Sequence, residues 1–292
     1  MNFCKIALIA LVSTSSFAYQ GLKNPETTRL KSMGGAGVAS ILINEAPILN
    51  PASVVFFNSS TFHYQQSKEE LNDISSDRVN SYENGHKELA IITDTSSGLR
   101  GGFAYEFQNV HAGKRKQFSL SFARNIGKKS GFGVAYKHNE EDSVVTNRKY
   151  SQMIIGGTHI RSKDLTIGFN IMDPLQSEPE YFSYTIGAQY TIKDKINLIA
   201  DIGSGDVKNY EDYGFNKICI QLEAFESLFI RYGRFHDLHL NEKGNSFGFS
   251  WTGPKLALDY AIKSSEIISE NSDTLLKGEK LLDSSIGLTL LF

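Results

Sequence analysis

Long apolar runs are missing from this chain of 292 residues, apart from a short one at its amino terminus. No central run approaches the roughly 20 residues that a membrane-spanning helix needs, and the mean hydropathy is −0.25. An excess of charge of one sign is missing too, since 30 basic and 32 acidic residues give a net charge of −2. The sequence therefore excludes a helical membrane protein and has no basic footprint for nucleic acid.

Cysteine is almost absent, with two residues in the whole chain. Residues 1–18 carry Lys5, the apolar run Ile6–Val12 and a small-residue stretch that ends at Ala18. This order is typical of a secretory signal peptide that is cut after Ala18. Cleavage leaves Cys219 alone, so we expect an exported chain without an intramolecular disulfide, as is common in the outer membrane and periplasm.

Beyond about residue 55, apolar side chains alternate with small or polar ones. Successive side chains of a strand point to opposite faces, so each such segment predicts a ribbon with one apolar and one polar side. The pattern predicts fourteen strands, at 58–67, 87–94, 99–107, 118–122, 132–136, 151–160, 165–171, 182–190, 196–202, 218–222, 228–232, 247–251, 256–262 and 286–292. The segments 87–94 and 151–160 are the weakest, and without them the count is twelve.

The length of each connection depends on whether the strand before it has an even or an odd number in the series. Those after the even-numbered strands are brief, whereas those after the odd-numbered ones are mostly longer and polar, as at 68–86 and 265–279. A transmembrane barrel predicts this sorting, with tight turns at one end and longer loops at the other. In hydrocarbon a sheet must also close on itself to pair its backbone. We therefore predict an all-β, antiparallel transmembrane β-barrel over residues 58–292.

The residues that alternate with the apolar ones, and so share the other face of each predicted strand, include many glycines and charged residues. Isolated charges in an apolar core would be too costly, so this face predicts a lumen that is hydrated or internally paired. The candidate lumen charges are Arg100, Glu106, Lys137, Asp201, Arg231, Asp259 and Lys263. The acidic groups Glu69-Glu70, Glu140-Glu141-Asp142 and Glu211-Asp212 are expected in solvated loops.

Residues 19–57 do not alternate and contain a glycine-rich patch. A phosphate-cradling loop would need a preceding strand, a longer glycine spacing and usually a lysine, so a nucleotide site is rejected. The patch instead resembles the amino-terminal segment of FadL/PorV-type outer-membrane proteins. The resemblance covers about 25 residues and lies in Arg29, Met33–Ala39 with Gly34, Gly35 and Gly37, Glu45-Ala46, and Asn50, Pro51 and Ala52. It implies that residues 19–57 form a hatch inside a barrel of fourteen strands, the number that the alternation gives independently.

The carboxyl terminus ends on an aromatic residue after an alternating apolar run. Ile286, Leu288, Leu290 and Phe292 share one parity and are similar to the signal by which outer-membrane barrels are handed to the barrel-assembly machinery. The expected partners are therefore outer-membrane lipid and that machinery.

The resemblance implies passive uptake of small hydrophobic molecules such as long-chain fatty acids. This chain is shorter than typical fatty-acid transporters, which leaves the ligand open. Alternatives are a PorV-like scaffold or secretion partner without transport activity, and a general porin. We expect no enzyme, cofactor or metal site, because there is no nucleophile elbow or helical zinc motif. His236 and His239 would lie on opposite faces of a strand and could bind a metal together only if they lie in a loop.

Overall fold

The computed structural model describes residues 22–72, 85–110, 112–143, 147–178, 181–207, 209–268 and 280–292. The predicted signal peptide at 1–18 lies outside these residues. Fourteen strands are present: β1 (Thr61–Asn72), β2 (Gly85–Asp94), β3 (Arg100–Val110), β4 (Gly113–Asn125), β5 (Ser130–Ser143), β6 (Asn147–Ile160), β7 (Leu165–Met172), β8 (Ser183–Ile192), β9 (Ile196–Ser204), β10 (Gly214–Phe225), β11 (Leu228–Asp237), β12 (Glu242–Thr252), β13 (Leu256–Ile267) and β14 (Lys280–Leu291).

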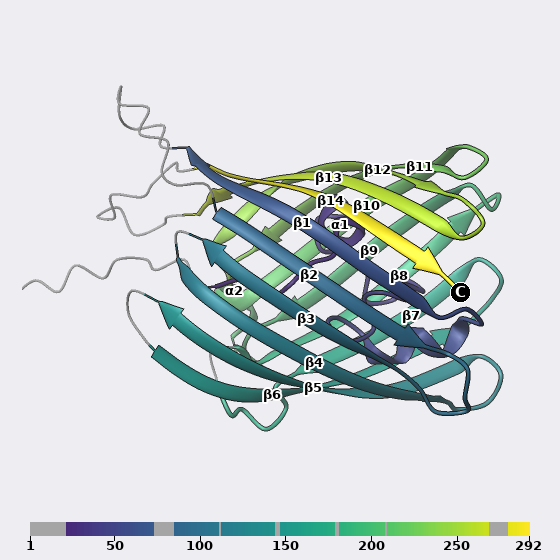
Figure 1. The fold of residues 1–292 in the computed structure, drawn as a ribbon, viewed down its shortest axis with the longest axis horizontal. Helices are drawn as coiled ribbons and strands as arrows, with labels where there is room; N and C mark the ends of the chain where they lie inside the picture. Colours follow the sequence, from purple (N-terminus) through teal and green to yellow (C-terminus); the bar gives the residue numbers. More distant parts are fainter. Residues whose placement is uncertain are drawn as a thin grey trace, which may run out of the picture.

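These strands form one closed barrel in sequence order (Figure 1). Each strand pairs antiparallel with its neighbours, and β1 closes the ring on β14 from the pair Thr61 with Leu291 to the pair Asn72 with Lys280. Closure leaves no unpaired sheet edge, as a sheet in hydrocarbon requires. The predicted all-β antiparallel barrel of fourteen strands is confirmed, including the two weakest strands.

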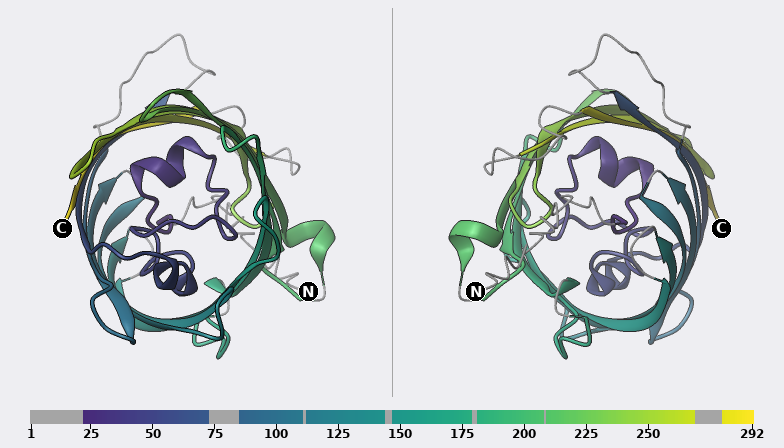
Figure 2. Two further views of the ribbon diagram at one scale, coloured as in Figure 1. Left: turned by 90° about the vertical axis from the view of Figure 1, so that its right-hand side faces the viewer. Right: turned by 90° about the vertical axis from the view of Figure 1, so that its left-hand side faces the viewer.

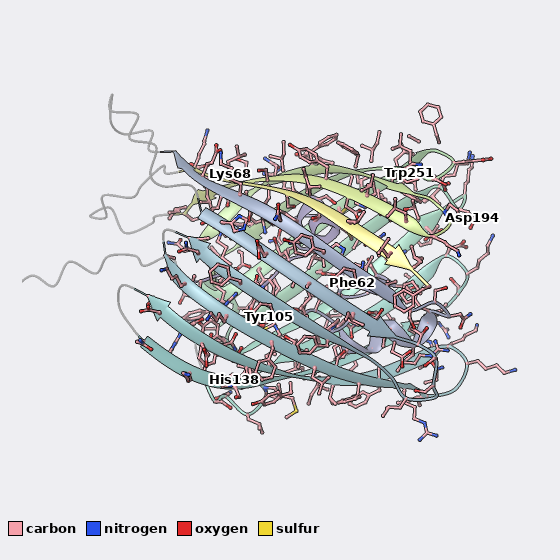
Figure 3. The ribbon with its side chains drawn as sticks, in the orientation of Figure 1. Phe62, Lys68, Tyr105, His138, Asp194 and Trp251 are labelled. Carbon is pink, nitrogen blue, oxygen red and sulfur yellow. The ribbon has the colours of Figure 1, made fainter. Side chains whose placement is uncertain are left out.

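The two faces of the barrel wall differ in the way that the alternation predicts. On β4, Phe118, Leu120 and Phe122 point outward and are exposed, whereas the side chains between them face inward and are buried. Side chains such as Tyr105 and Trp251 likewise stand on the outside of the ribbon (Figure 3). The outer face is therefore apolar and the inner face polar, the arrangement that a lipid-embedded barrel needs.

Short connections lie at one end of the barrel, which we call the turn end, together with the carboxyl terminus (Figure 1). Its connections are 95–99, 126–129, 161–164, 193–195, 226–227 and 253–255. At the other end, the loop end, the connections 73–84, 173–182, 205–213 and 268–279 are longer, but 111–112, 144–146 and 238–241 are not. The prediction is therefore confirmed for the connections after the even-numbered strands, which are all short and lie at the turn end, but only some connections at the loop end are long.

Some connections at the loop end are short because the strands extend beyond the apolar segments from which their ends were predicted. Glu140, Glu141 and Asp142 lie in β5, and Glu69 and Glu70 lie in β1, so the prediction of loops was wrong for both groups. Glu141 faces the lumen, where it is buried among polar partners. Polar strand ends of this kind resemble loops in a sequence, because their inward residues are as hydrophilic as their outward ones.

Residues 22–57, the inner segment, lie inside the barrel (Figure 2). The segment contains the helix α1 (Thr28–Ser32) and the 3₁₀ helix η1 (Pro51–Phe56), and it continues into β1. A third helix, α2 (Tyr210–Tyr213), holds Glu211 and Asp212 between β9 and β10. None of the helices in the described part of the chain is long and apolar enough to cross a membrane.

Candidate functional site

The glycine-rich patch ends α1 and turns the chain back inside the barrel. Thr27 caps α1 by accepting a hydrogen bond from the Leu30 amide at 3.1 Å. Gly34 and Gly35 then take left-handed φ angles of +67° and +81°, which residues with a Cβ rarely adopt. Met33 lies beyond the helix in a buried cluster with Ala36 and Leu42 from the segment and Ile199 and Cys219 from the wall.

Glycines of the barrel wall allow the inner segment to approach the strands closely. A Cβ on Gly233 would overlap the backbone of Met33 and Gly34, and a Cβ on Gly156 would overlap the Asn50 side chain. Similar close approaches occur at Gly131, Gly133, Gly168, Gly248 and Gly287. The small residues on the polar parity therefore form the surface that receives the inner segment.

Asp201 of β9 holds the glycine patch through its carboxylate. Its Oδ2 accepts hydrogen bonds from the backbone amides of Gly37 at 2.7 Å and Val38 at 3.0 Å. The carboxylate is buried, so these two amides replace the water that would otherwise solvate it.

Asn50, Pro51 and Ala52 attach the second half of the inner segment to β5 and β6. The Asn50 Nδ2 donates to the Val38 carbonyl at 2.7 Å and to Thr158 Oγ1 at 2.9 Å. Its Oδ1 accepts from the Ala52 amide at 3.1 Å and so caps η1, with Pro51 as the first helical residue. Asn50 therefore serves both as a helix cap and as a link between the segment and the wall.

Two arginines predicted from the sequence lie at different places along the inner segment. Arg100 donates to the carbonyl oxygens of Val55, at 2.6 Å, and Phe57, where the segment leaves the lumen. Arg29 is half-buried in α1, and its guanidinium makes no hydrogen bond or ion pair with another residue that the structure describes.

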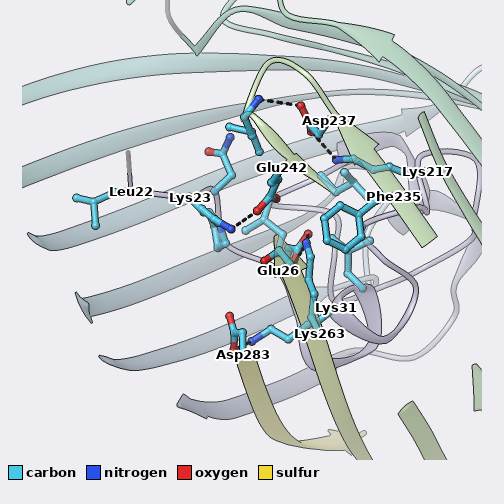
Figure 4. A pocket seen from close by; sticks show the side chains of 18 of the residues that line it. Leu22, Lys23, Glu26, Lys31, Lys217, Phe235, Asp237, Glu242, Lys263 and Asp283 are labelled. Carbon is cyan, nitrogen blue, oxygen red and sulfur yellow. Dashed lines mark hydrogen bonds and ion pairs between the residues drawn. The ribbon is translucent and has the colours of Figure 1, made fainter. Parts of the chain in front are cut away.

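A cavity of about 390 Å³ lies between the inner segment and the wall, toward the loop end (Figure 4). Part of its lining is apolar and comes from Leu22, Leu30, Ile48, Leu49, Leu89, Met172, Phe215, Phe235, Leu240 and Leu281. We call this space the lumen pocket. The inner segment forms one side of it, so any displacement of the segment would open or reshape the pocket.

The charged part of the lumen pocket consists of ion pairs between the inner segment and the strands. Lys263 Nζ lies 2.8 Å from Glu26, over the ring of Phe235. Lys23 pairs with Glu242, and Lys31 pairs with Asp283. Each of these pairs joins one residue of the inner segment to one residue of the wall.

Asp283 also forms an ion pair with Lys87 of β2, with a distance of 2.9 Å. A further pair joins Lys217 to Asp237 at 3.7 Å (Figure 4). The pocket therefore presents lysines whose charges are already matched by carboxylates. Buried pairs of this kind stabilise one geometry, and removal of one partner leaves the other charge uncompensated.

The pKa values of two groups in the inner segment report this environment. Burial alone would raise the pKa of Glu26, but the ammonium groups of Lys263, Lys217 and Lys31 outweigh it and hold that pKa below its usual value. Burial lowers the pKa of Lys31, although Asp283 opposes the shift. The folded protein therefore favours the charged form of Glu26 and disfavours the charged form of Lys31.

A second polar network joins inward side chains of β3, β4, β5 and β6 to Tyr181, just before β8. Arg115 is 3.3 Å from Glu106 and 3.5 Å from Glu141, and Arg148 lies 3.2 Å from Glu141. Tyr150 and Tyr181 stack with ring centroids 5.2 Å apart, under the Arg148 guanidinium. Tyr181, which lies just before β8, is thus held to β6 by aromatic and cation–π contacts.

The structure brings together few of the lumen charges that the sequence singles out. Arg231 and Asp259 are 3.7 Å apart and share Ser250 as a hydrogen-bond partner. The others are distributed around the wall, with Glu106 and Lys263 at the pocket and Asp201 at the glycine patch. Lys137 is buried on β5, and its Nζ has no hydrogen-bond partner among the residues that the structure describes.

Several residues of the pocket and of the second polar network were missed by sequence reasoning. Glu26, Lys31 and Lys23 lie in a segment without periodicity, so no pattern marked them. Asp283, Arg115 and Glu141 have the inward parity of their strands and could have been found by extending those strands.

The remaining predicted residues lie away from the pocket. Ile286, Leu288 and Leu290 point outward from β14, and Phe292 follows it at the turn end. His236 lies on β11 and His239 in the next loop. The described part of the chain contains no group of three or more His, Cys, Asp or Glu residues that could hold a metal ion.

No protein-family model matches the chain, and a search of curated proteins finds no relative. Solved structures do match. The CymD monoaromatic hydrocarbon channel is 10% identical over 95% of this chain and 99% of its own, with a TM-score of 0.64. The Pseudomonas putida toluene transporter TodX is 10% identical, with 93% and 98% covered and a TM-score of 0.64. A Pseudomonas aeruginosa FadL homologue is 10% identical, with 92% and 99% covered and a TM-score of 0.60. At this identity the likeness shows the fold, which is the FadL-type barrel that the sequence resemblance predicts.

Proposed function

Starting from the FadL-type fold, we propose that this chain is a passive outer-membrane channel for small hydrophobic molecules, with the inner segment as its hatch. The solved structures that share the fold include channels described for monoaromatic hydrocarbons and toluene. Long-chain fatty acids are the candidate ligands named by the sequence resemblance. Passive transport needs no catalytic group, and we propose that the chain is not an enzyme.

The lumen pocket is the observation that carries this proposal. Its volume of about 390 Å³ lies within the range of roughly 300–1,000 Å³ that is usual for ligand pockets. Apolar side chains such as Leu89, Leu281 and Phe215 would receive an acyl chain or ring. Lys31, Lys87 and Lys263 stand beside them, but they are already paired with Asp283 and Glu26, so a carboxylate head would have to displace one of these ion pairs. The apolar part of the lining is therefore the part that favours a hydrophobic ligand.

Passage through the barrel requires the inner segment to move. A ligand that enters at the loop end reaches the lumen pocket, and the segment occupies the bore between this pocket and the turn end. The links that must yield are side-chain contacts, such as Lys31 with Asp283 and Asp201 with the Gly37 amide. The wall itself can stay closed, because its backbone ladder takes no part in these links.

Two neighbouring serines of β13 provide a test. Ser265 faces the pocket and is buried, whereas Ser264 points outward. We expect Ser265→Phe to fill the pocket and weaken the binding of a fluorescent long-chain fatty acid at least about tenfold, since a filled cavity excludes the ligand. Ser264→Phe adds the same ring on the lipid side and should bind like the wild type.

Titration of both variants in detergent, followed by fatty-acid uptake into liposomes, separates binding from passage. If the wild type shows no saturable binding, or if Ser264→Phe loses as much affinity as Ser265→Phe, the pocket is not the ligand site.

A further inference from the structure

Basic side chains gather on one half of the turn end. They belong to three successive turns, 126–129, 161–164 and 193–195, which connect neighbouring strands from β4 to β9. The cations are Lys128, Lys129, Arg161, Lys163, Lys193 and Lys195, and the accompanying carboxylates are Asp164 and Asp194. We call this set the basic rim. Figure 3 marks its position by Asp194, at the end of the barrel opposite Lys68.

The other turns of the same end are nearly free of charge. The turn 226–227 carries Glu226, the turn 253–255 carries Lys255, and the connection 95–99 carries neither acid nor base. Lipid head groups surround a barrel on all sides, so residues that serve them would recur at every turn. A charge confined to three adjacent turns instead fits a partner that contacts one side of the rim.

The basic rim is held rigid by its own backbone. The Ile160 amide donates to the Lys129 carbonyl, the Thr191 amide to the Asp164 carbonyl and the Glu223 amide to the Lys195 carbonyl, each at 2.8 Å. Lys163 and Asp194 add an ion pair of 3.0 Å between two turns. The backbone of turns that are linked in this way loses little conformational entropy on binding, so the cost falls mainly on the side chains.

Most cations of the rim are available to a partner. Lys128, Lys129, Arg161, Lys193 and Lys195 are exposed, and none makes an ion pair with another residue in the described ranges. Lys193 also has a left-handed φ of +52°, followed by Asp194 at +58°. Such hairpin turns favour Asn or Gly at the first of these positions, so a lysine there goes against the local backbone preference.

We propose that the basic rim docks an acidic segment of a periplasmic protein partner. Short turns of outer-membrane barrels face the periplasm, so such a partner would approach from that side. The rim offers several unpaired cations to a run of carboxylates, which steers association and makes it sensitive to salt. This inference is independent of the ligand that the lumen pocket takes.

The proposal can be tested with the full chain in nanodiscs of phosphatidylcholine and a fluorescein-labelled deca-glutamate peptide. The test variant combines Lys128→Gln, Lys129→Gln, Lys193→Gln and Lys195→Gln. The matched control removes four exposed lysines from the strands near the loop end, as Lys68→Gln, Lys114→Gln, Lys116→Gln and Lys149→Gln. Heat-modifiable gel mobility checks that both variants are folded barrels.

We expect the wild type and the control to bind the peptide alike, and the rim variant to bind at least about tenfold more weakly. Binding should also weaken by about tenfold or more when the salt concentration rises from about 50 to 300 mM, because exposed charges are screened. Equal losses in the two variants would show attraction by charge in general and would overturn the proposal. Absence of peptide binding together with enrichment of phosphatidylglycerol beside the rim would assign the surface to lipid and would overturn it as well.

Discussion

The carboxylate of Asp201 accepts a hydrogen bond of 2.7 Å from the backbone amide of Gly37. The two residues come from the two parts of the molecule that matter most for function, the wall of the barrel and the glycine patch of the inner segment. A buried carboxylate on a strand thus holds a backbone turn in the lumen.

Replacement of Asp201 by Ala should loosen the glycine patch without opening the barrel. The variant leaves the amides of Gly37 and Val38 without their acceptor, and an unsatisfied buried donor costs about 1–3 kcal/mol. Hydrogen exchange at these amides, followed by mass spectrometry, should therefore accelerate by roughly ten- to a hundredfold. Asp194→Ala, in an exposed turn, is the control, and unchanged exchange in Asp201→Ala would contradict this role.

Gly233 tests whether the wall glycines receive the inner segment. In Gly233→Ala the added Cβ meets the backbone of Met33 and Gly34, which no rotamer change can relieve. We expect a loss of about 1–3 kcal/mol, the usual cost of overpacking, seen as a lower melting temperature and easier proteolysis of the inner segment. Gly98→Ala has open space around the new methyl group and should behave like the wild type.

The strands and their two faces were predictable because apolar residues alternate with small or polar ones in each of them. On β14, for example, Ile286 and Leu290 face outward while Ser285 and Thr289 are buried in the lumen. The ends of the strands were not predictable. Arg115 and Glu141 lie in β4 and β5 but are as polar as loop residues, since the lumen that they face is polar.

The site was predictable only in part. Gly37, Asn50 and Asp201 were singled out from the sequence, and the structure places each at a contact between the inner segment and the wall. The pair of Lys31 with Asp283 was not, because the two residues are 252 positions apart. Only closure of the barrel around the inner segment brings them together.

Acid should weaken the attachment of the inner segment to the wall, because it protonates Glu26 and so removes its ion pair with Lys263. Its pKa in the folded protein lies below the ordinary value of 4.5, so the folded state favours the charged carboxylate. This contribution to stability is complete above pH 4.5 and is lost as the pH falls through the lower, folded-state pKa. The protection of residues 22–32 against hydrogen exchange, taken relative to the intrinsic exchange rate at each pH, should fall as the pH drops below about 4.5, and Glu26→Gln should show a smaller change.

The inner segment should keep the barrel electrically closed. It occupies the bore and is linked to the wall by Asp201, Asn50 and the ion pair of Lys31 with Asp283. We therefore expect the wild type to show no steady ion conductance in planar bilayers, which separates it from a general porin. The double variant Asp201→Ala with Asn50→Ala removes two of these links and should produce intermittent conductance, because the segment then leaves its place more often. A steady open current from the wild type would show that the segment does not seal the lumen, and the role of a hatch would have to be abandoned.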